Sequence, residues 1–212
     1  YTNVDLINCI IKENNASEGG GILALGGENL FIENNTIYEN TANKGGAVYL
    51  SVLERVTISE SNFTKNTAFD SGCGVFVSNI IDGLKISRSV FVDSSAIYGG
   101  GIYFDSTKVL ITNSSFIENK VVESGGGIYV YKGDSFGISE SSFIKNYGKI
   151  GGGIYGYEQI FYKTNCTFKE NKVGTSGGGV HVIYSPLSNT DHCIFEKNEV
   201  NSVSIAVGGG AT

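Results

Sequence analysis

The sequence predicts an all-β parallel β-helix, a solenoid of about eight coils with about 26 residues in each. Three observations lead to this fold class. Gly-Gly-Gly-Ile-Tyr is spelled three times, at residues 99–103, 125–129 and 151–155, and a second motif, Phe-x-x-Asn, recurs in step with it. Apolar residues between the two motifs alternate with a period of two, which is typical of β-strands. A repeat period between roughly 20 and 50 residues indicates a solenoid, propeller or array.

The composition argues against a nucleic-acid-binding or membrane-spanning protein. With 212 residues, 41% of them hydrophobic, the chain can bury a sizeable core, and a net charge of −6 does not fit a nucleic-acid partner. No apolar run approaches the roughly 18 residues of a membrane span, so we expect no membrane insertion in this segment. No starting Met, charged n-region or apolar h-region stands at Tyr1, so we expect either a mature chain or a piece of a longer one. We therefore expect residues 1–212 to form a single solenoid, as a segment of a longer chain or as one unit of a fibre.

The glycine motif predicts a corner that every coil must turn. Glycine reaches positive φ and tolerates close backbone approach without a Cβ penalty. After the corner, alternation places Ile102, Ile128 and Ile154 inside the solenoid and the tyrosines that follow them outside, because one residue of slip would reverse every face. Substituted forms of the motif stand at residues 20–22, 46–48, 73–75, 178–180 and 209–211.

The remaining apolar residues predict three short strands in each coil. Pairs spaced by two, such as Val56 with Ile58 and Leu84 with Ile86, precede the Phe position, and the glycine-led strand follows it. No repeat contains a helical stripe, which excludes leucine-rich and ankyrin repeats, and a propeller blade needs about 40 residues. One coil of a parallel β-helix fits, with equivalent residues stacked about 4.8 Å apart.

The Phe-x-x-Asn motif predicts a buried asparagine ladder. A polar group inside a turn costs about 1 to 3 kcal/mol if it is not hydrogen-bonded, and the same residue in the coils above and below can satisfy it. Ser94 breaks the ladder at one rung. Its members are Asn14, Asn40, Asn66, Asn119, Asn146, Asn171 and Asn198.

A second inward column of small residues lies two positions before each Phe equivalent. It predicts that Cys166 and Cys193 are direct neighbours in adjacent coils, whereas Cys9 lies many coils away and Cys73 belongs to the glycine corner. A bond between Cys166 and Cys193 stays open, because stacked strands space Cβ atoms by about 4.8 Å and a disulfide prefers about 3.8 Å. The column comprises Cys9, Asn35, Ser61, Ser89, Ser114, Ser141, Cys166 and Cys193.

An outward column after the glycine corner is mostly aromatic. Such a stripe can hold sugar rings or a partner surface. Alternatively, the rings stabilise the sheet by stacking on the coils above and below. The exposed aromatic ladder is expected to comprise Tyr49, Phe76, Tyr103, Tyr129 and Tyr155, with Leu23 and His181 at its ends.

Five Asn-x-Ser/Thr sequons are candidate N-glycosylation sites. A chain this rich in Asn, Ser and Thr contains several such triplets by composition alone, so their placement matters more than their number. Asn34, Asn113 and Asn165 share one outward register, and Asn62 also points outward. The five sites are Asn15, Asn34, Asn62, Asn113 and Asn165.

The paired Gly-Gly-apolar and Phe-x-x-Asn motifs resemble the repeat of the polymorphic outer membrane proteins, the autotransported surface adhesins of chlamydiae. The resemblance covers essentially the whole chain. It implies a right-handed parallel β-helix outside a cell, with a role in adhesion or surface architecture. The sequence departs from that pattern in its Gly-Gly-Gly-Ile-Tyr form and in lacking a transporter barrel, so the resemblance does not fix the organism.

Catalytic and metal sites are not expected. Asn189-Thr190-Asp191 resembles the Asn-Thr-Asp motif of polygalacturonases, but the Asp-Asp, Gly-His-Gly and Arg-x-Lys motifs of that family are missing. Inverting hydrolysis needs a second carboxylate about 6.5 to 9.5 Å away. His181 and His192 occupy outward positions and do not converge. A metal site requires three or four converging ligands. No cofactor is expected, because the glycine triplets lack a following Lys-Ser or Lys-Thr.

Two functions follow from these observations. The first is a non-enzymatic rod outside the cell or on its surface, with a structural or adhesive role. We expect it to bind a surface glycan or protein. Its ends are expected to join further coils, either by head-to-tail self-association or by continuation of the same chain. The alternative is a carbohydrate-active β-helix enzyme of the polysaccharide lyase or hydrolase type. An enzyme requires two or more carboxylates that converge on one outer groove.

Overall fold

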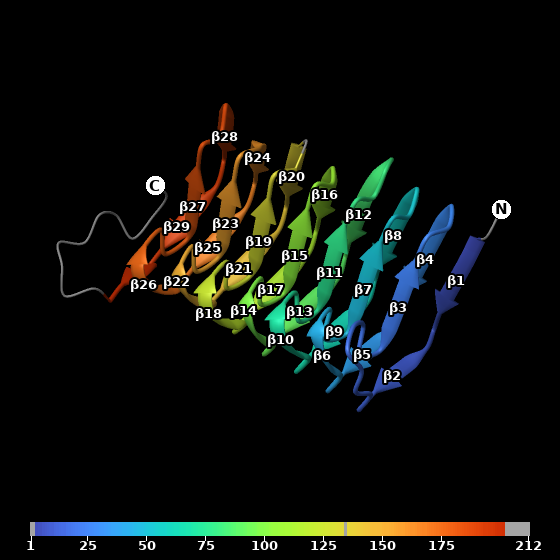
Figure 1. Cartoon of the computed structure of the whole chain (residues 1–212). Coiled ribbons are helices and arrows are strands. Elements are labelled where there is room, and N and C mark those ends of the chain that lie inside the picture. Colours follow the sequence, from blue (N-terminus) through green and yellow to red (C-terminus); the bar gives the residue numbers. More distant parts are fainter. Residues whose placement is uncertain (1–2, 134, 202–212) are drawn as a thin grey trace.

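The computed structural model describes residues 3–133 and 135–201 of the chain. Every regular element in this part is a strand, and 30 short strands form a right-handed parallel β-solenoid (Figure 1). The chain passes through four parallel sheets in each coil, which we name A, B, C and D in the order in which they are reached. The glycine motif at residues 209–211 lies outside the described residues.

Sheet A contains β1 (Asn3–Ile7), β4 (Asn29–Glu33), β8 (Arg55–Ser59), β12 (Gly83–Ser87), β16 (Val109–Thr112), β20 (Ser135–Ser139), β24 (Ile160–Thr164) and β28 (Leu187–Asp191). Sheet B contains β2 (Ile10–Lys12), β5 (Thr36–Tyr38), β9 (Asn62–Thr64), β13 (Val90–Val92), β17 (Ser115–Ile117), β21 (Ser142–Ile144), β25 (Thr167–Lys169) and β29 (Ile194–Glu196).

Sheet C contains β6 (Thr41–Lys44), β10 (Thr67–Ser71), β14 (Ser95–Tyr98), β18 (Lys120–Ser124), β22 (Tyr147–Ile150), β26 (Lys172–Ser176) and β30 (Glu199–Val200). Sheet D contains β3 (Ile22–Leu25), β7 (Val48–Ser51), β11 (Val75–Ser78), β15 (Ile102–Asp105), β19 (Ile128–Tyr131), β23 (Ile154–Tyr157) and β27 (Val180–Ile183).

The prediction of three strands per coil is wrong, because sheet C adds a fourth. Its inward residues in the earlier coils are small, as at Ala42, Ala68 and Ala96, and its pairing shifts register within several strands. Small inward residues provide little hydrophobic contrast with their outward neighbours, so the period of two is weak there.

The register of sheet D is as predicted. Ile102 pairs with Ile128 and Ile128 with Ile154, and each of the three isoleucines is 0% exposed. The following tyrosines stack in register on the outer side of the sheet. A fixed register is expected where one face of a sheet is buried and the other is solvated.

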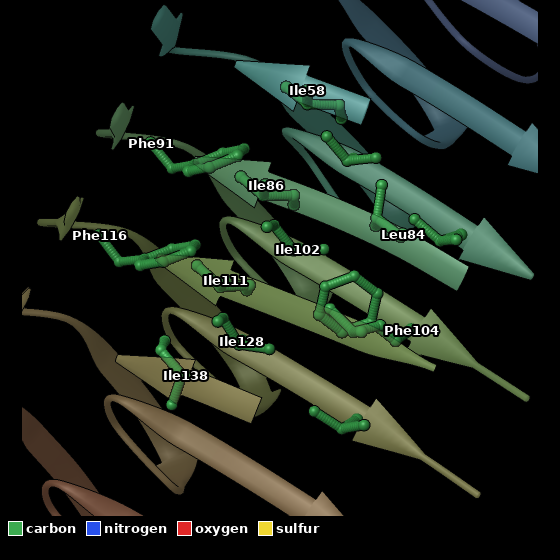
Figure 2. Packing of buried hydrophobic residues seen from close by; sticks show 14 of the residues in the cluster. Ile58, Leu84, Ile86, Phe91, Ile102, Phe104, Ile111, Phe116, Ile128 and Ile138 are labelled. Atoms are coloured by element: carbon green, nitrogen blue, oxygen red, sulfur yellow. The ribbon is translucent and has the colours of Figure 1, made fainter. Parts of the chain in front are cut away.

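The main core is one continuous cluster built of parallel columns. Isoleucines of sheet A lie in one column, and phenylalanines of sheet B lie in another (Figure 2). The rings of Phe63, Phe91, Phe116, Phe143, Phe168 and Phe195 stack with centroids 4.6–4.9 Å apart. Offset ring stacking at this separation is favourable, so each ring helps to fix the position of the ring in the next coil.

The asparagine ladder lies at the corner between sheets B and C. Asn40, Asn66, Asn119, Asn146 and Asn171 are 0% exposed. Asn198 is half-buried and Asn14 is exposed, so the expectation that the whole ladder is buried is wrong at its two ends. Asn14 contacts a ladder neighbour on one side only, because it belongs to the first described coil.

Ser94 does not abolish the ladder. The Asn66 backbone N–H donates to Ser94 Oγ at 3.3 Å, and the Ser94 backbone N–H donates to Asn119 Oδ1 at 3.2 Å. The serine hydroxyl therefore accepts the same backbone hydrogen bond as an amide oxygen, but it lacks the side-chain bond to the next rung.

Glycine closes the corner between sheets C and D. Gly125 has a φ of 71°, and a Cβ at Gly126 would meet the carbonyl oxygen of Tyr147 at 2.8 Å. The conformation and the close approach both exclude a side chain, so these positions need glycine.

Non-glycine residues with φ between 47° and 57° begin two further corners of each coil. The AB corner, between sheets A and B, begins at Asn8, Asn34, Glu60, Arg88, Asn113, Glu140, Asn165 and His192. The BC corner, between sheets B and C, begins at Glu13, Glu39, Lys65, Asp93, Glu118, Lys145, Glu170 and Lys197. Their side chains project from the edges of the rod.

No helix within the described residues is long and apolar enough to cross a membrane.

Candidate binding surface

The aromatic column of sheet D forms a continuous stack. Ring centroids lie 4.8–5.6 Å apart from Tyr49 through Phe76, Tyr103, Tyr129 and Tyr155 to His181, and neighbouring rings are within 15° of parallel. Each inner ring therefore has both faces covered by the rings of adjacent coils. Only ring edges point outward, which is the wrong side for stacking a sugar.

The expectation of an exposed ladder is wrong, because Phe76 is buried and the other four members are only half-buried, namely Tyr49, Tyr103, Tyr129 and Tyr155. Phe76 is only 5% exposed, and the Lys44 ammonium lies 5.2 Å from its ring centroid. Tyr98 packs its ring edge against Tyr129 at 5.3 Å. Burial raises the pKa of Tyr103 and of Tyr129 well above the usual value, as expected for enclosed phenols. This geometry favours a stabilising role for the column.

An open groove lies along the BC corner of the later coils. Its volume is about 590 Å³, and it is lined by Lys120, Lys145, Tyr147, Glu170, Lys172, Lys197 and Glu199. Tyr147 is 45% exposed. The groove thus combines an accessible aromatic ring with four ammonium groups and two carboxylates.

The repeat itself builds this groove from two columns. Lys120, Tyr147, Lys172 and Glu199 each begin a strand of sheet C, and they pair in register. Lys145, Glu170 and Lys197 open the BC corner in successive coils. Because coils repeat at about 4.8 Å, lysines two coils apart, such as Lys120 and Lys172, have backbones about 10 Å apart.

Each groove lysine contacts a carboxylate. Lys172 and Glu199 are 3.1 Å apart, Lys145 and Glu118 3.6 Å, Lys197 and Glu196 3.6 Å, and Lys120 and Asp93 3.9 Å. These side chains are solvent-exposed, and exposed ion pairs contribute only about 0 to 1 kcal/mol. An anionic ligand can therefore replace a carboxylate partner at little cost.

Sequence reasoning missed the groove. The signal was present, because lysine recurs at the first position of sheet C in Lys120 and Lys172 and at the BC corner in Lys145 and Lys197. It was hidden because sheet C was not predicted.

The remaining candidates for chemistry are dispersed. Asn189, Thr190 and Asp191 lie on exposed β28, and Asp191 pairs with His192 at 2.7 Å. His181 stacks on Tyr155 with its Nδ1 3.2 Å from Ser176 Oγ, and burial lowers its pKa. No group of three or more His, Cys, Asp or Glu residues suited to a metal occurs in residues 3–133 and 135–201.

The structure brings Cys166 and Cys193 together. The Cys166 backbone N–H donates to Cys193 Sγ at 3.4 Å, and both cysteines are thiols, as are Cys9 and Cys73. Close to this pair lies Lys163, an inward residue of β24 that is 2% exposed and that sequence analysis did not single out. Its inward position follows from the alternation in sheet A.

The five sequon asparagines all have exposed side chains. Asn34, Asn113 and Asn165 open the AB corner, and Asn62 begins β9 beside it. Asn15 lies apart from them and forms a bridge to Thr41. Four of the five sites therefore follow one edge of the rod, and none lies on sheet D.

Comparison with known proteins supports this architecture. Two overlapping stretches, residues 1–116 and 57–212, match the family described as "Right handed beta helix region". Over 127 residues, 59% of this chain, the sequence is 26% identical to the metabotropic glutamate receptor-like protein Q of Dictyostelium discoideum, of which it spans only 10%. No solved structure matches significantly. The chain belongs to the right-handed β-helix family.

Proposed function

We propose that this chain is part of an extracellular, non-enzymatic β-helix rod that binds an acidic glycan along the BC-corner groove. The observation that carries the proposal is the in-register alternation of lysines with the exposed Tyr147. The tyrosine ring offers an apolar surface for a sugar ring, and the ammonium groups offer partners for carboxylate or sulfate. An extended glycan with one acidic group on every second sugar repeats its charge over a distance comparable to two coils.

The negative net charge of the chain indicates that an acidic glycan would be bound by the groove lysines alone. At −6 it opposes the approach of a polyanion, so binding must come from the groove lysines rather than from general attraction. The affinity should fall as salt rises, since the contacts are solvent-exposed.

The test is a binding titration with heparin and with hyaluronan, which separate sulfate from carboxylate recognition, and with neutral dextran as the control. Replacing Lys120 and Lys172 by glutamine should weaken binding by roughly 2- to 5-fold for each lysine. The matched control replaces Lys85 and Lys108, exposed lysines outside the groove, and should leave affinity unchanged. Equal losses in both double variants, or no binding of either acidic glycan at low salt, would refute the proposal.

A second candidate function is carbohydrate cleavage in the same groove. One observation favours it, since Glu170 and Glu199 both line the groove and could form the carboxylate pair that glycoside hydrolysis requires. Incubation with pectin, alginate and the bound glycan is the test. Release of reducing or unsaturated ends that disappears in Glu170→Gln and in Glu199→Gln would replace binding by catalysis as the function.

Association at the first coil is part of the same proposal. An apolar hollow of about 470 Å³ there is lined by residues including Val4, Leu6, Leu30 and Leu53. We propose that a further coil, from the same polypeptide or from a second copy, covers these side chains. Light scattering of this chain over a range of concentrations tests the second-copy case, and a dispersed monomer at high concentration would exclude it.

A further inference from the structure

Lys163 replaces a hydrophobic residue of the core. In sheet A the preceding residues of its inward column are Leu6, Ile32, Ile58, Ile86, Ile111 and Ile138. The Lys163 ammonium lies 4.1 Å from the ring centroid of Phe161 and donates to Ser188 Oγ at 3.1 Å. No carboxylate among the described residues forms an ion pair with it. Burying a cation without a carboxylate partner costs free energy of folding, so we expect Lys163 to have a functional role.

The two stacked thiols are ionisable groups that interact with this amine. Burial lowers the pKa of Lys163 to about 8, and the sulfurs of Cys193 and Cys166 act in the opposite direction, which places both within electrostatic range of the amine. Cys166 is 1% exposed, and burial raises its pKa to about 11. Cys193 is half-buried, so only one of the two thiols can be reached from solvent.

We propose that Cys193, Cys166 and Lys163 form a thiol–disulfide exchange site that links the last two described coils covalently when the chain meets a disulfide oxidant. Cys193 is the attacking thiol, Cys166 is the resolving thiol, and Lys163 is a positioning residue whose positive charge favours the thiolate. The inference is independent of the proposed glycan binding.

The chemistry balances with a small disulfide as the oxidant. The Cys193 thiolate attacks one sulfur of the oxidant, forms a mixed disulfide and releases one thiolate. The Cys166 thiolate then attacks Cys193 Sγ, forms the Cys166–Cys193 bond and releases the second thiolate. Two protein thiols are oxidised, the oxidant is reduced to two thiols, and these take up the two protons that the cysteines lose.

The geometry permits closure with a small movement. Adjacent coils are about 4.8 Å apart, within the Cα separation of roughly 4.4 to 6.8 Å that disulfides span. The Cβ atoms must approach by about 1 Å relative to ideal stacking. Cys193 can supply that shift, since His192 and Ile194 on either side of it are exposed.

The experiment treats the reduced 212-residue chain with oxidised glutathione and labels the remaining thiols after unfolding without reductant. We expect two of the four cysteines to lose their reactivity and peptide mapping to find Cys166 joined to Cys193. Retention of four labelled thiols, or pairing through Cys9 or Cys73, would overturn the proposal.

Serine variants define the order of attack. Serine is the natural residue of this column at Ser89, Ser114 and Ser141, where its Oγ accepts a backbone N–H from the preceding coil, so these variants retain the local hydrogen bonds. In Cys166→Ser a glutathione adduct should accumulate on Cys193, and in Cys193→Ser Cys166 should stay unmodified. An adduct on Cys166 in the second variant, or no adduct in the first, would refute the assigned roles.

Lys163→Met separates positioning from structure. Loss of the positive charge should move the pH profile of Cys193 modification to higher pH without altering which cysteines pair, and an unchanged profile would remove Lys163 from the site.

Discussion

Asn146 and Asn171 are joined twice across adjacent coils. Asn171 Oδ1 accepts one hydrogen bond from the Asn146 backbone N–H and a second from Asn146 Nδ2, both at 3.0 Å. Asn146 Nδ2 also donates to the Phe116 carbonyl at 2.9 Å. Each amide thus satisfies two backbone groups of the preceding coil inside a corner that water does not reach, and its Nδ2 also donates to the amide of the next coil, which makes the ladder a structural element of the rod.

Asn146→Ala should destabilise the chain strongly. The substitution leaves the Asn119 N–H and the Phe116 carbonyl without their partner, and each buried unsatisfied group costs about 1 to 3 kcal/mol. Asn146→Ser is the matched variant, because Ser94 shows that a hydroxyl accepts the same backbone N–H. Denaturant unfolding should therefore rank wild type above serine and serine above alanine. Equal losses for serine and alanine would contradict this account.

Gly126→Ala tests the close approach at the glycine corner. A Cβ would collide with backbone atoms of the next coil at Gly152 and Tyr147, which cannot move away as a flexible side chain can. We expect a loss of about 1 to 3 kcal/mol, typical of overpacking. Gly174→Ala is the control, since its added Cβ finds its nearest neighbours in Lys149 at an ordinary 3.8 Å. Thermal unfolding should separate the two variants, and similar melting temperatures would show that the corner can relax.

Most of the fold could be predicted because large inward side chains mark sheets A, B and D. Phe116 recurs in the Phe-x-x-Asn motif, and Ile128 alternates with Val130 after the repeated glycine corner, so repeat spacing and alternation indicate their faces. Sheet C could not be predicted in this way. Ala68 and Ala96 pack with Cys73 and Val121 in a separate small cluster beside the glycine corner. An inward column that changes between Ala, Gly and Val gives only a weak apolar period.

The candidate site was less predictable for a related reason. The aromatic column was identified from its register, but the orientation of the rings depends on stacking between coils, and this orientation covers the ring faces of Tyr103 and Tyr129. The groove depends on two columns that meet only when sheet C and the BC corner are both in place. Lys163 could have been found by asking which charged residue falls on an inward position.

Lys163→Ile should stabilise the reduced chain at neutral pH. Replacing a buried charged group by a packed hydrophobic residue commonly stabilises a protein by about 1 to 4 kcal/mol, and isoleucine is the residue of this column in the preceding coils. Lys85→Ile, an exposed lysine of the same sheet, should change stability by less than about 0.5 kcal/mol. A less stable Lys163→Ile chain would contradict the desolvation argument.

The pH dependence of wild-type stability gives a second readout for Lys163. Its pKa is about 8 in the folded chain and 10.5 without burial, so below pH 8 both states bind the proton and the full desolvation cost applies. Above pH 8 the unfolded state binds more protons, so the free energy of unfolding rises with pH. The Cys166 thiol, raised from 9.0, opposes this trend above pH 9. Unfolding between pH 8 and 9 should show the rise in wild type and not in Lys163→Ile.

The AB corner should carry N-glycans when the chain passes through a eukaryotic secretory pathway. Asn34, Asn113 and Asn165 have exposed side chains on a corner that lies outside the core, so a glycan there displaces water and no packed side chain. Intact mass before and after enzymatic deglycosylation, with peptide mapping, measures occupancy at each site. The melting temperature should not fall on glycosylation, because no buried group is disturbed.

Thr36→Ala provides the control for this prediction. It removes the sequon of Asn34 but keeps Asn34 itself, whose Nδ2 donates to Asn8 Oδ1 at 2.6 Å in the neighbouring coil. The variant should lose one glycan and keep its stability within about 0.5 kcal/mol, since Thr36 is exposed. Asn34→Gln should lose the same glycan and, in addition, the contact between the coils. Wild-type chain that is secreted with all three asparagines unmodified would show that this corner is not an acceptor, and the exposed edge would then need another explanation.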